Sequence, residues 1–192
     1  MNATYVYYLG LGSNLEPATH FSTALCKLQA KFGKLLVWPV ITTPPVDIDT
    51  THTFFNTLVV LQSTLPPEAL KHWTNALEVQ CGRDRSDPLS SHKDRPLDID
   101  ILAQQSQLDL SILEQFKEPY IRAVIAAGRQ TELESVGPTD RHEIIVQGQR
   151  LGQRTATIDS DHAGGHVMIV EDSVDSLLQS FKAAFYREQS LC

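Results

Sequence analysis

The amino-acid sequence predicts an α+β protein in which a sheet of short strands is covered by helices. Apolar runs of strand length alternate with two segments whose apolar residues recur at helical spacing. Proline opens both helical segments, and glycine or clusters of polar residues separate the elements from one another.

The first half of the chain contains the clearest elements. In chain order we expect a strand at residues 5–11, a helix at 17–32, strands at 35–41 and 54–61, a helix at 66–77 and a strand at 97–102. Pro39 indicates that the second strand lies at a sheet edge or contains a bulge. The order β-α-β-β-α-β predicts a ferredoxin-like arrangement, in which two helices cover one face of an antiparallel sheet.

The second half gives weaker patterns. Residues 111–127 are expected to be helical in part, and residues 143–146 and 166–170 look like short strands that could form a hairpin. A C-terminal helix is expected from an apolar stripe formed by Val174, Leu177, Leu178, Phe181 and Phe185.

The length of 192 residues suits one domain with a sizeable core. We expect that domain to span residues 1–192, with the ferredoxin-like core at 1–103 and a C-terminal extension at 104–192. The net charge of −7 argues against a nucleic-acid partner, since binding to a phosphate backbone needs a basic surface.

The distribution of cysteine and apolar residues indicates a compartment. The three cysteines show no metal-ligand spacing, so we expect reduced thiols and a cytoplasmic protein. No basic region precedes the apolar stretch at the N-terminus, as it would in a signal peptide. No apolar run approaches the roughly 18 residues that a membrane span needs. We therefore expect no membrane partner, and a monomer is favoured.

Asp98 and Asp100 are the first candidates for chemistry. They stand two apart in a predicted strand, so both carboxylates project from one face while Ile99 and Ile101 face the core. Adjacent carboxylates repel each other, and oxygen ligands on one face suit Mg²⁺, which completes its shell with water and phosphate oxygens. The alternative is a solvated strand face near an arginine.

Four cations accompany this strand in the sequence. Arg83 and Arg85 stand at one end of the polar segment 82–93, and Lys93 and Arg95 stand at the other. Guanidinium groups bind phosphate oxygens bidentately and neutralise the charge that develops in phosphoryl transfer. Each cation alone could be an ordinary surface residue, but their clustering in an acidic chain predicts a triphosphate site and a phosphoryl-type transferase.

Two further segments could contact a ligand. The sequence Gly10-x-Gly12-Ser13-Asn14 reads as a turn after the first strand, and no G-K-[ST] follows it, so it is either a structural turn or a ligand-binding loop. Thr43-Pro44-Pro45 and Phe54-Phe55-Asn56 bracket a long loop. An aromatic ring and an amide can stack on and hydrogen-bond a flat heterocycle, although core packing of one phenylalanine is an alternative.

These motifs, in this order, resemble the 6-hydroxymethyl-7,8-dihydropterin pyrophosphokinase family, whose members transfer pyrophosphate from ATP to a pterin alcohol. The matching elements are Leu11-Gly12-Ser13-Asn14-Leu15, Thr43-Pro44-Pro45, Phe55-Asn56, Glu78 with Gly82-Arg83-Asp84-Arg85, and Arg95-Pro96-Leu97-Asp98-Ile99-Asp100-Ile101. They cover residues 5–103, roughly half of the chain, and the final element is the most specific.

The resemblance implies a site and a reaction. Asp98 and Asp100 would bind two Mg²⁺ ions that bridge the ATP phosphates, and Arg83, Arg85 and Arg95 would hold those phosphates or close over them. The nucleotide side would also include Glu78, Lys93, Tyr120 and Arg122. The pterin pocket would be lined by Thr43, Pro44, Val46, Phe54 and Asn56. The implied activity is diphosphotransfer in folate biosynthesis, with ATP and a reduced pterin as substrates and AMP as a product.

The chain departs from the family pattern in two places. The loop at 86–94 is slightly longer than usual and lacks the tryptophan that stacks on the pterin in many members, and Lys93 could supply a missing cation. Pro119-Tyr120 stands where members tend to have Pro-His. Two alternatives therefore remain: a catalytically impaired relative that binds nucleotide or pterin in a regulatory or interaction role, and an unrelated ferredoxin-like sensor of a small molecule.

Overall fold

The computed structural model describes residues 4–45, 50–87, 93–129, 140–160, 166–179 and 181. The elements are β1 (Tyr5–Ser13), α1 (Pro17–Phe32), β2 (Leu35–Val37), β3 (Ile41–Thr43), β4 (Phe54–Ser63), α2 (Pro67–Gln80), β5 (Asp98–Gln105), η2 (Leu110–Gln115), α3 (Pro119–Arg129), β6 (Ile144–Val146), β7 (Gln149–Leu151), β8 (Ala156–Ser160) and β9 (Val167–Glu171). Residues 174–179 are also helical. The predicted α+β class is confirmed. In these described ranges, no helix has the length and apolar content needed to cross a membrane.

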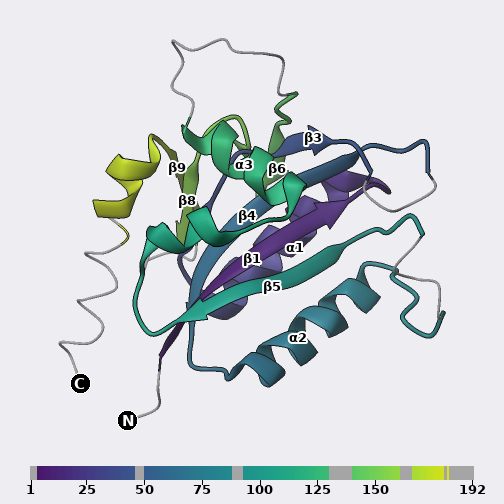
Figure 1. Cartoon of the computed structure of the whole chain (residues 1–192), viewed down its shortest axis with the longest axis horizontal. Helices are drawn as coiled ribbons and strands as arrows, with labels where there is room; N and C mark the ends of the chain where they lie inside the picture. The colour runs from purple at the N-terminus through teal and green to yellow at the C-terminus, as the bar shows by residue number, and fades with distance from the viewer. Residues whose placement is uncertain are drawn as a thin grey trace.

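One antiparallel sheet organises the molecule. Its strands follow the order β5-β1-β4-β2-β8-β9, and β3 pairs with β4 beside this path. Helices α1 and α2 pack on one face, while η2, α3 and the helix at 174–179 pack on the other (Figure 1). The sheet is therefore the middle layer of three.

Alternation along β1 explains why its sequence is apolar throughout. Tyr7, Leu9 and Leu11 point into the core formed with α1 and α2, whereas Val6 and Tyr8 point into the core formed with α3. A strand that is covered on both faces loses the polar residues that would otherwise alternate with apolar ones.

The prediction of one continuous strand at 35–41 is wrong, because the structure divides this segment into β2 and β3. Val37 pairs with Val59 and Ile41 pairs with Asn56, so four steps along this segment match only three steps along β4. The extra residue forms a bulge-like break at Pro39, which has no N–H to donate to the ladder. Beyond it, the Val40 N–H donates to the Gly152 carbonyl at 2.9 Å instead.

The expected hairpin between residues 143–146 and 166–170 is also wrong. β6 pairs with β7, and β9 pairs with β8. β8 in turn pairs with β2, so the C-terminal extension adds two strands to the sheet. Neither β7 nor β8 carries a long apolar run, and β8 acquires its place through a partner more than a hundred residues earlier in the chain.

The outermost strand of this extension, β9, is partly covered by a side chain. The Gln149 amide accepts a hydrogen bond from the Ile169 N–H at 3.2 Å and donates one to the Val167 carbonyl. Met168 and Val170, which lie on the same strand, are 49% and 54% exposed. The backbone of β9 is therefore engaged on both sides while part of its apolar surface faces solvent.

Candidate active site

The candidate active site begins with two glycines inside β1. Gly12 pairs with Asp98 and Gly10 pairs with Asp100, and on its other side Gly12 pairs with Asn56. The predicted turn at Gly10–Asn14 is therefore wrong, since β1 continues to Ser13. A Cβ at Gly12 would lie 3.0 Å from Asn56 Oδ1, so glycine keeps the surface between the aspartates and Asn56 clear.

A cavity of about 140 Å³ opens above these glycines. The lining residues are Gly10, Gly12, Thr43, Pro44, Phe54, Asn56, Arg95, Asp98, Asp100 and Tyr120. Apart from the two glycines, every lining residue was predicted as a site residue from the sequence. The cavity thus brings the carboxylate pair from β5 together with the residues that bracket the first long loop.

Asp98 is held between two arginines. Its carboxylate accepts hydrogen bonds from Arg83 through one oxygen and from Arg95 through the other. Burial alone would raise the pKa of Asp98, but the charges and hydrogen bonds of Arg83 and Arg95 outweigh it and hold the pKa below its ordinary value. Asp98 is therefore an ionised, fixed carboxylate.

Asp100 has a different environment. Its nearest cation is Lys71 on α2, whose Nζ lies 3.6 Å from Asp100 Oδ1 and donates to the Ile99 carbonyl at 2.8 Å. Burial and the neighbouring Asp98 charge raise the pKa of Asp100, and Lys71 opposes this only in part. The second carboxylate of the pair thus carries a repulsion that an additional cation would relieve.

Glu78 lies beneath the arginines and is fully buried. One carboxylate oxygen accepts hydrogen bonds from Arg83 Nη1 and from Arg85 Nε, each at 2.9 Å. The other oxygen accepts from the Ile99 N–H at 2.8 Å. Glu78 therefore fixes both arginines to the start of β5, and burial of its charge is offset by these partners.

The opposite wall of the cavity is built from the end of β3 and the start of β4. Asn56 Nδ2 donates to Thr43 Oγ1 at 2.7 Å, and both side chains are buried. The Arg95 guanidinium lies over the Phe54 ring, with Cζ 5.7 Å from the ring centroid. This wall offers a flat apolar surface next to an oriented amide.

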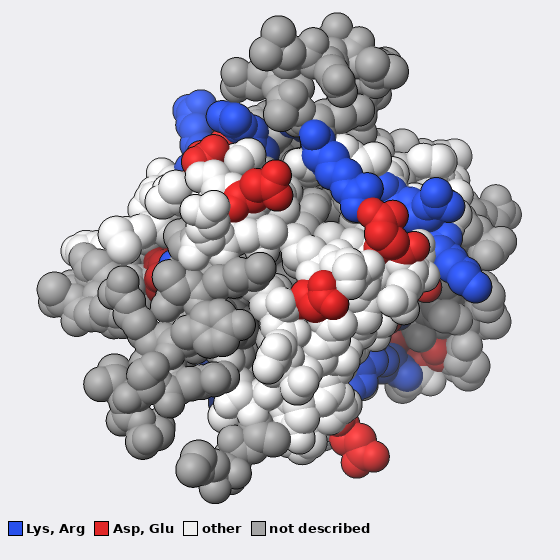
Figure 2. All heavy atoms as spheres, turned by 60° about the vertical axis from the view of Figure 1, so that its left-hand side comes forward, with Lys and Arg blue, Asp and Glu red and all other residues white. Residues whose placement is uncertain are grey.

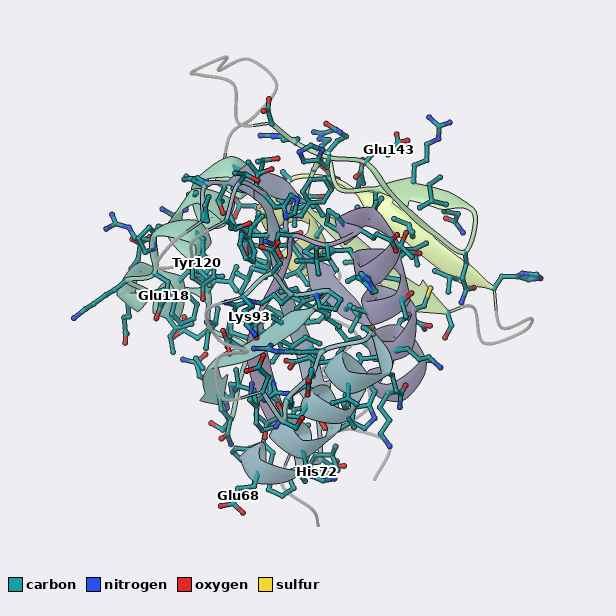
Figure 3. All side chains as sticks on the ribbon, turned by 90° about the vertical axis from the view of Figure 1, so that its right-hand side faces the viewer. Glu68, His72, Lys93, Glu118, Tyr120 and Glu143 are labelled. Atoms are coloured by element: carbon teal, nitrogen blue, oxygen red, sulfur yellow. The ribbon has the colours of Figure 1, made fainter. Side chains whose placement is uncertain are left out.

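The remaining predicted residues are placed as follows. Lys93 pairs with Asp87 at 2.5 Å, and Arg122 is exposed on α3 and does not line the cavity. Tyr120 lies at the start of α3, and burial, followed by the Asp100 charge, raises its pKa to about 12. Figure 3 labels Lys93 and Tyr120 in one region of the view, away from Glu68 and His72 on α2. Val46 and residues 88–92 lie outside the described residues.

The donor set at Asp98 and Asp100 fits a magnesium ion. Both residues supply hard carboxylate oxygens from one face of β5, and burial, followed by the Asp98 charge, raises the pKa of Asp100, which a bound cation would oppose. Within the described ranges, no group of three or more His, Cys, Asp or Glu side chains converges to hold a metal by itself. Such an ion would therefore need oxygens from a phosphate ligand or water to complete its shell.

The sequence analysis did not predict that Lys71 lies near Asp100, or that Gly10 and Gly12 form the floor of the cavity inside β1. Lys71, Thr74 and Glu78 recur at helical spacing on α2, so the buried Glu78 could have indicated that Lys71 faces β5 as well. Gly10 and Gly12 alternate with Leu9 and Leu11, which is strand periodicity and was available in the sequence.

Comparison with known proteins identifies the chain as a diphosphotransferase. The family model for 7,8-dihydro-6-hydroxymethylpterin-pyrophosphokinase matches residues 8–127. Two curated relatives, from two strains of Porphyromonas gingivalis, are each named 2-amino-4-hydroxy-6-hydroxymethyldihydropteridine pyrophosphokinase. Each is 34% identical over 126 residues, which cover 61% of this chain and 86% of the relative. The chain belongs to the 7,8-dihydro-6-hydroxymethylpterin-pyrophosphokinase family.

Proposed function

We propose that this chain transfers pyrophosphate from ATP to the hydroxymethyl group of 6-hydroxymethyl-7,8-dihydropterin and releases AMP, as a step in folate biosynthesis. The observation that carries the proposal is one cavity that joins Asp98 and Asp100 to Thr43, Phe54 and Asn56. The carboxylates suit a magnesium-bound polyphosphate, and the other three residues suit a flat heterocycle with polar edges.

In this reaction the hydroxymethyl oxygen attacks the β-phosphorus of ATP. The bond from that phosphorus to the bridging oxygen of AMP breaks, and the hydroxyl proton is lost to solvent. The protein contributes mainly positioning and charge neutralisation. Arg83, Arg85 and Arg95 would bind the phosphate oxygens on which charge accumulates. Two magnesium ions, held by Asp98 and Asp100, would supply Lewis-acid neutralisation of the same oxygens.

The acceptor would bind against the β3–β4 wall. The hydrogen bond from Asn56 to Thr43 orients the Asn56 carbonyl oxygen toward Gly12, where it could accept from an N–H of the pterin. The Phe54 ring would contact the flat face of the heterocycle. Pro44 and Val46 complete the proposed pocket.

On the nucleotide side we assign an indirect part to Glu78. Its carboxylate holds Arg83 and Arg85, so it would act by placing these two cations and not by touching ATP. Lys93, Tyr120 and Arg122 stay in the proposal as nucleotide-side residues. Tyr120 lines the cavity and, with a pKa of about 12, would donate a hydrogen bond as a neutral hydroxyl.

The proposal includes the scaffold and the setting of the enzyme. The strand order β5-β1-β4-β2, with α1 and α2 on one face, supports a ferredoxin-like core at residues 1–103 within a single domain of 1–192. The free thiols of Cys26 and Cys81 support a reducing, cytoplasmic setting. We propose a monomer that acts on ATP and a reduced pterin.

The test is AMP formation from ATP, Mg²⁺ and 6-hydroxymethyl-7,8-dihydropterin. We expect AMP that depends on the pterin, and a loss of at least about 100-fold in the Asp98→Asn variant. Binding without turnover is a second candidate function, because Tyr120 supplies no positive charge at its position. Absence of AMP together with tight pterin binding in calorimetry would establish that candidate and reject the enzyme.

A further inference from the structure

A second cavity lies at the far end of α3 from Tyr120. Its volume is about 380 Å³, against about 140 Å³ for the candidate active site. The cavity is bounded by the C-terminal end of α3, by η2, by the two residues before β8 and by the helix at 174–179. Among the described residues the two cavities have no lining residue in common, so the second one has no part in the proposed reaction.

One side of this cavity is aromatic and apolar. Trp38 contributes to the lining and is otherwise buried, at 1% exposure, and Leu113, Ile125 and Leu178 surround it. A Cβ at Gly128 would collide with the Trp38 indole, so the absence of a side chain lets α3 lie directly on the ring. This packing fixes the indole at the base of the cavity, behind the aliphatic side chains.

The other side is basic. Arg129, Arg141 and Arg154 all contribute to the lining. The Arg141 guanidinium donates to the Ala127 carbonyl at 2.9 Å and to the Gln153 carbonyl at 2.6 Å, which holds it in place. Figure 2, which brings the left side of Figure 1 forward, shows Lys and Arg side chains gathered along the upper part of this face, with acidic side chains near them. Guanidinium groups arranged in this way suit a carboxylate, sulfonate or phosphate.

Two acidic residues also line the cavity, and one of them is already engaged. Asp172 accepts hydrogen bonds from the Ser173 N–H and from Ser176 Oγ, each at 2.6 Å. These bonds, together with the Arg154 charge, lower the pKa of Asp172. Asp172 therefore serves the start of the helix at 174–179. Asp175 lines the cavity as well, and Arg129 pairs with Glu114, so Arg141 and Arg154 are the main source of positive charge for a ligand.

Thr155 supplies an independent indication of a ligand. Its side chain is 2% exposed and lines the cavity, and its hydroxyl has no hydrogen-bond partner within the described part of the chain. A buried hydroxyl without a partner costs about 1–3 kcal/mol, so such groups call for a specific explanation. The hydroxyl lies just behind the cavity surface, so a ligand group that approaches it closely would satisfy it.

We propose that this cavity binds a small organic anion with a flat aromatic body. The ring would lie against the aliphatic side chains of Leu113, Ile125 and Leu178, close to Trp38. The anionic group would lie among Arg129, Arg141 and Arg154, and the Thr155 hydroxyl would donate a hydrogen bond to it. The site would take an aromatic carboxylate, sulfonate or phosphate ester, and its occupation would not require turnover at Asp98 and Asp100.

The chain offers a built-in reporter for this site. It contains two tryptophans, and Trp73 packs against Phe32 on the opposite face of the sheet, with ring centroids 5.0 Å apart. In the full chain carrying Trp73→Phe, fluorescence therefore reports on Trp38 alone. The probe is 8-anilinonaphthalene-1-sulfonate, and N-phenyl-1-naphthylamine, which lacks only the sulfonate, is its neutral match.

We expect saturable quenching of Trp38 by the sulfonate and at least about 10-fold weaker binding of the neutral probe. Arg154→Gln should weaken sulfonate binding about 10-fold, whereas Arg150→Gln, which changes an exposed arginine paired with Glu143, should leave it unchanged. Thr155→Val should weaken binding about 3- to 10-fold without lowering the melting temperature, because it removes an unsatisfied hydroxyl.

Either of two results would overturn the proposal: no response of Trp38 fluorescence, or equal binding of the two probes. Affinity that neither Arg154→Gln nor Thr155→Val changes would overturn it as well. If the Arg154→Gln protein does not fold, the affinity of the Thr155→Val protein for the sulfonate probe decides the test. None of these measurements depends on AMP formation, so this site can fail while the proposed function stands.

Discussion

Asp94 Oδ2 lies 2.6 Å from Nδ1 of His52, and this contact joins two loops beside the candidate active site. The other oxygen of Asp94 accepts a hydrogen bond from Asn14 Nδ2 at 2.6 Å. The pKa of Asp94 is lowered mainly by a hydrogen bond from Thr50, and further by His52 and Asn14, while burial opposes the shift. One carboxylate therefore connects the segments before β4 and β5 to the turn after β1.

A double-mutant cycle of His52→Ala and Asp94→Ala should detect this connection. Because the pair is partly exposed, we expect a coupling free energy of about 0.5–1 kcal/mol from urea unfolding. The lowered pKa of Asp94 means that its contribution is present above about pH 4 and is lost as the pH falls through its folded-state pKa. Strictly additive single-mutant effects near neutral pH would show that the contact contributes nothing.

Asp98→Asn and Asp100→Asn should have the same effect on catalysis and different effects on stability. Both variants should lose at least about 100-fold in turnover, because each removes a proposed magnesium ligand. Asp98→Asn should also destabilise the fold by about 2 kcal/mol, because Arg83 and Arg95 lose their shared partner. Asp100→Asn should change stability by less than about 0.5 kcal/mol, since it relieves repulsion. Equal unfolding midpoints for the two variants would contradict this account.

Glu78→Gln should impair ATP binding from a distance. The amide would leave Arg83 and Arg85 without their buried counter-charge, so we expect a loss of about 3 kcal/mol in stability and a raised KM for ATP. Glu68→Gln changes an exposed glutamate on the same helix and serves as the matched control (Figure 3). A Glu78→Gln protein with unaltered KM for ATP would reject the indirect part assigned to Glu78.

Gly12→Ala should separate binding of the acceptor from binding of ATP. The new Cβ would lie 3.0 Å from Asn56 Oδ1, inside the proposed pterin pocket. We expect pterin affinity to fall about 10-fold in calorimetry while ATP affinity changes little. In Gly10→Ala the new Cβ would meet Ile121 at 3.1 Å, so that variant should instead lose stability. Loss of ATP affinity alone in Gly12→Ala would place the pterin elsewhere.

Stability should decline at high pH through Tyr8. Its hydroxyl donates to the Asp109 carbonyl at 2.7 Å, and burial, the largest cause, raises the pKa from 10.0 to about 12. The neutral form is favoured in the folded state, so its stabilisation is fully present below pH 10 and is lost as the pH rises toward 12. The loss should be on the order of 2 kcal/mol. Tyr8→Phe should show a shallower decline in unfolding midpoint over this range, and identical slopes would contradict the assignment.

The sequence predicted the elements that depend on local pattern. Helix α1 begins at Pro17 and ends before Gly33 as expected, because proline, the apolar stripe and glycine all lie within the segment itself. The break at Pro39 was indicated only as an edge or a bulge, since its form depends on the pairing with β4. β8 was missed because its burial comes from β2, and no local pattern encodes that partner.

The same distinction applies to the candidate site. Asp98 and Asp100 lie two apart in one strand, so their common face followed from strand periodicity, and Arg95 belongs to the same short motif. The sharing of Asp98 between Arg83 and Arg95 did not follow, because it depends on how α2 packs against β5. The position of Lys71 beside β5 depends on the same packing, so the sequence alone did not predict it.

The side chain of Gln149 has a consequence beyond the fold of one molecule. An uncovered sheet edge is a template on which another polypeptide can form a further strand, and exposed Met168 and Val170 would strengthen such an association. Gln149 engages the Val167 carbonyl and the Ile169 N–H in the way that a neighbouring strand would. A single amide thereby occupies the backbone groups that an added strand would need, which disfavours association of two molecules through this edge.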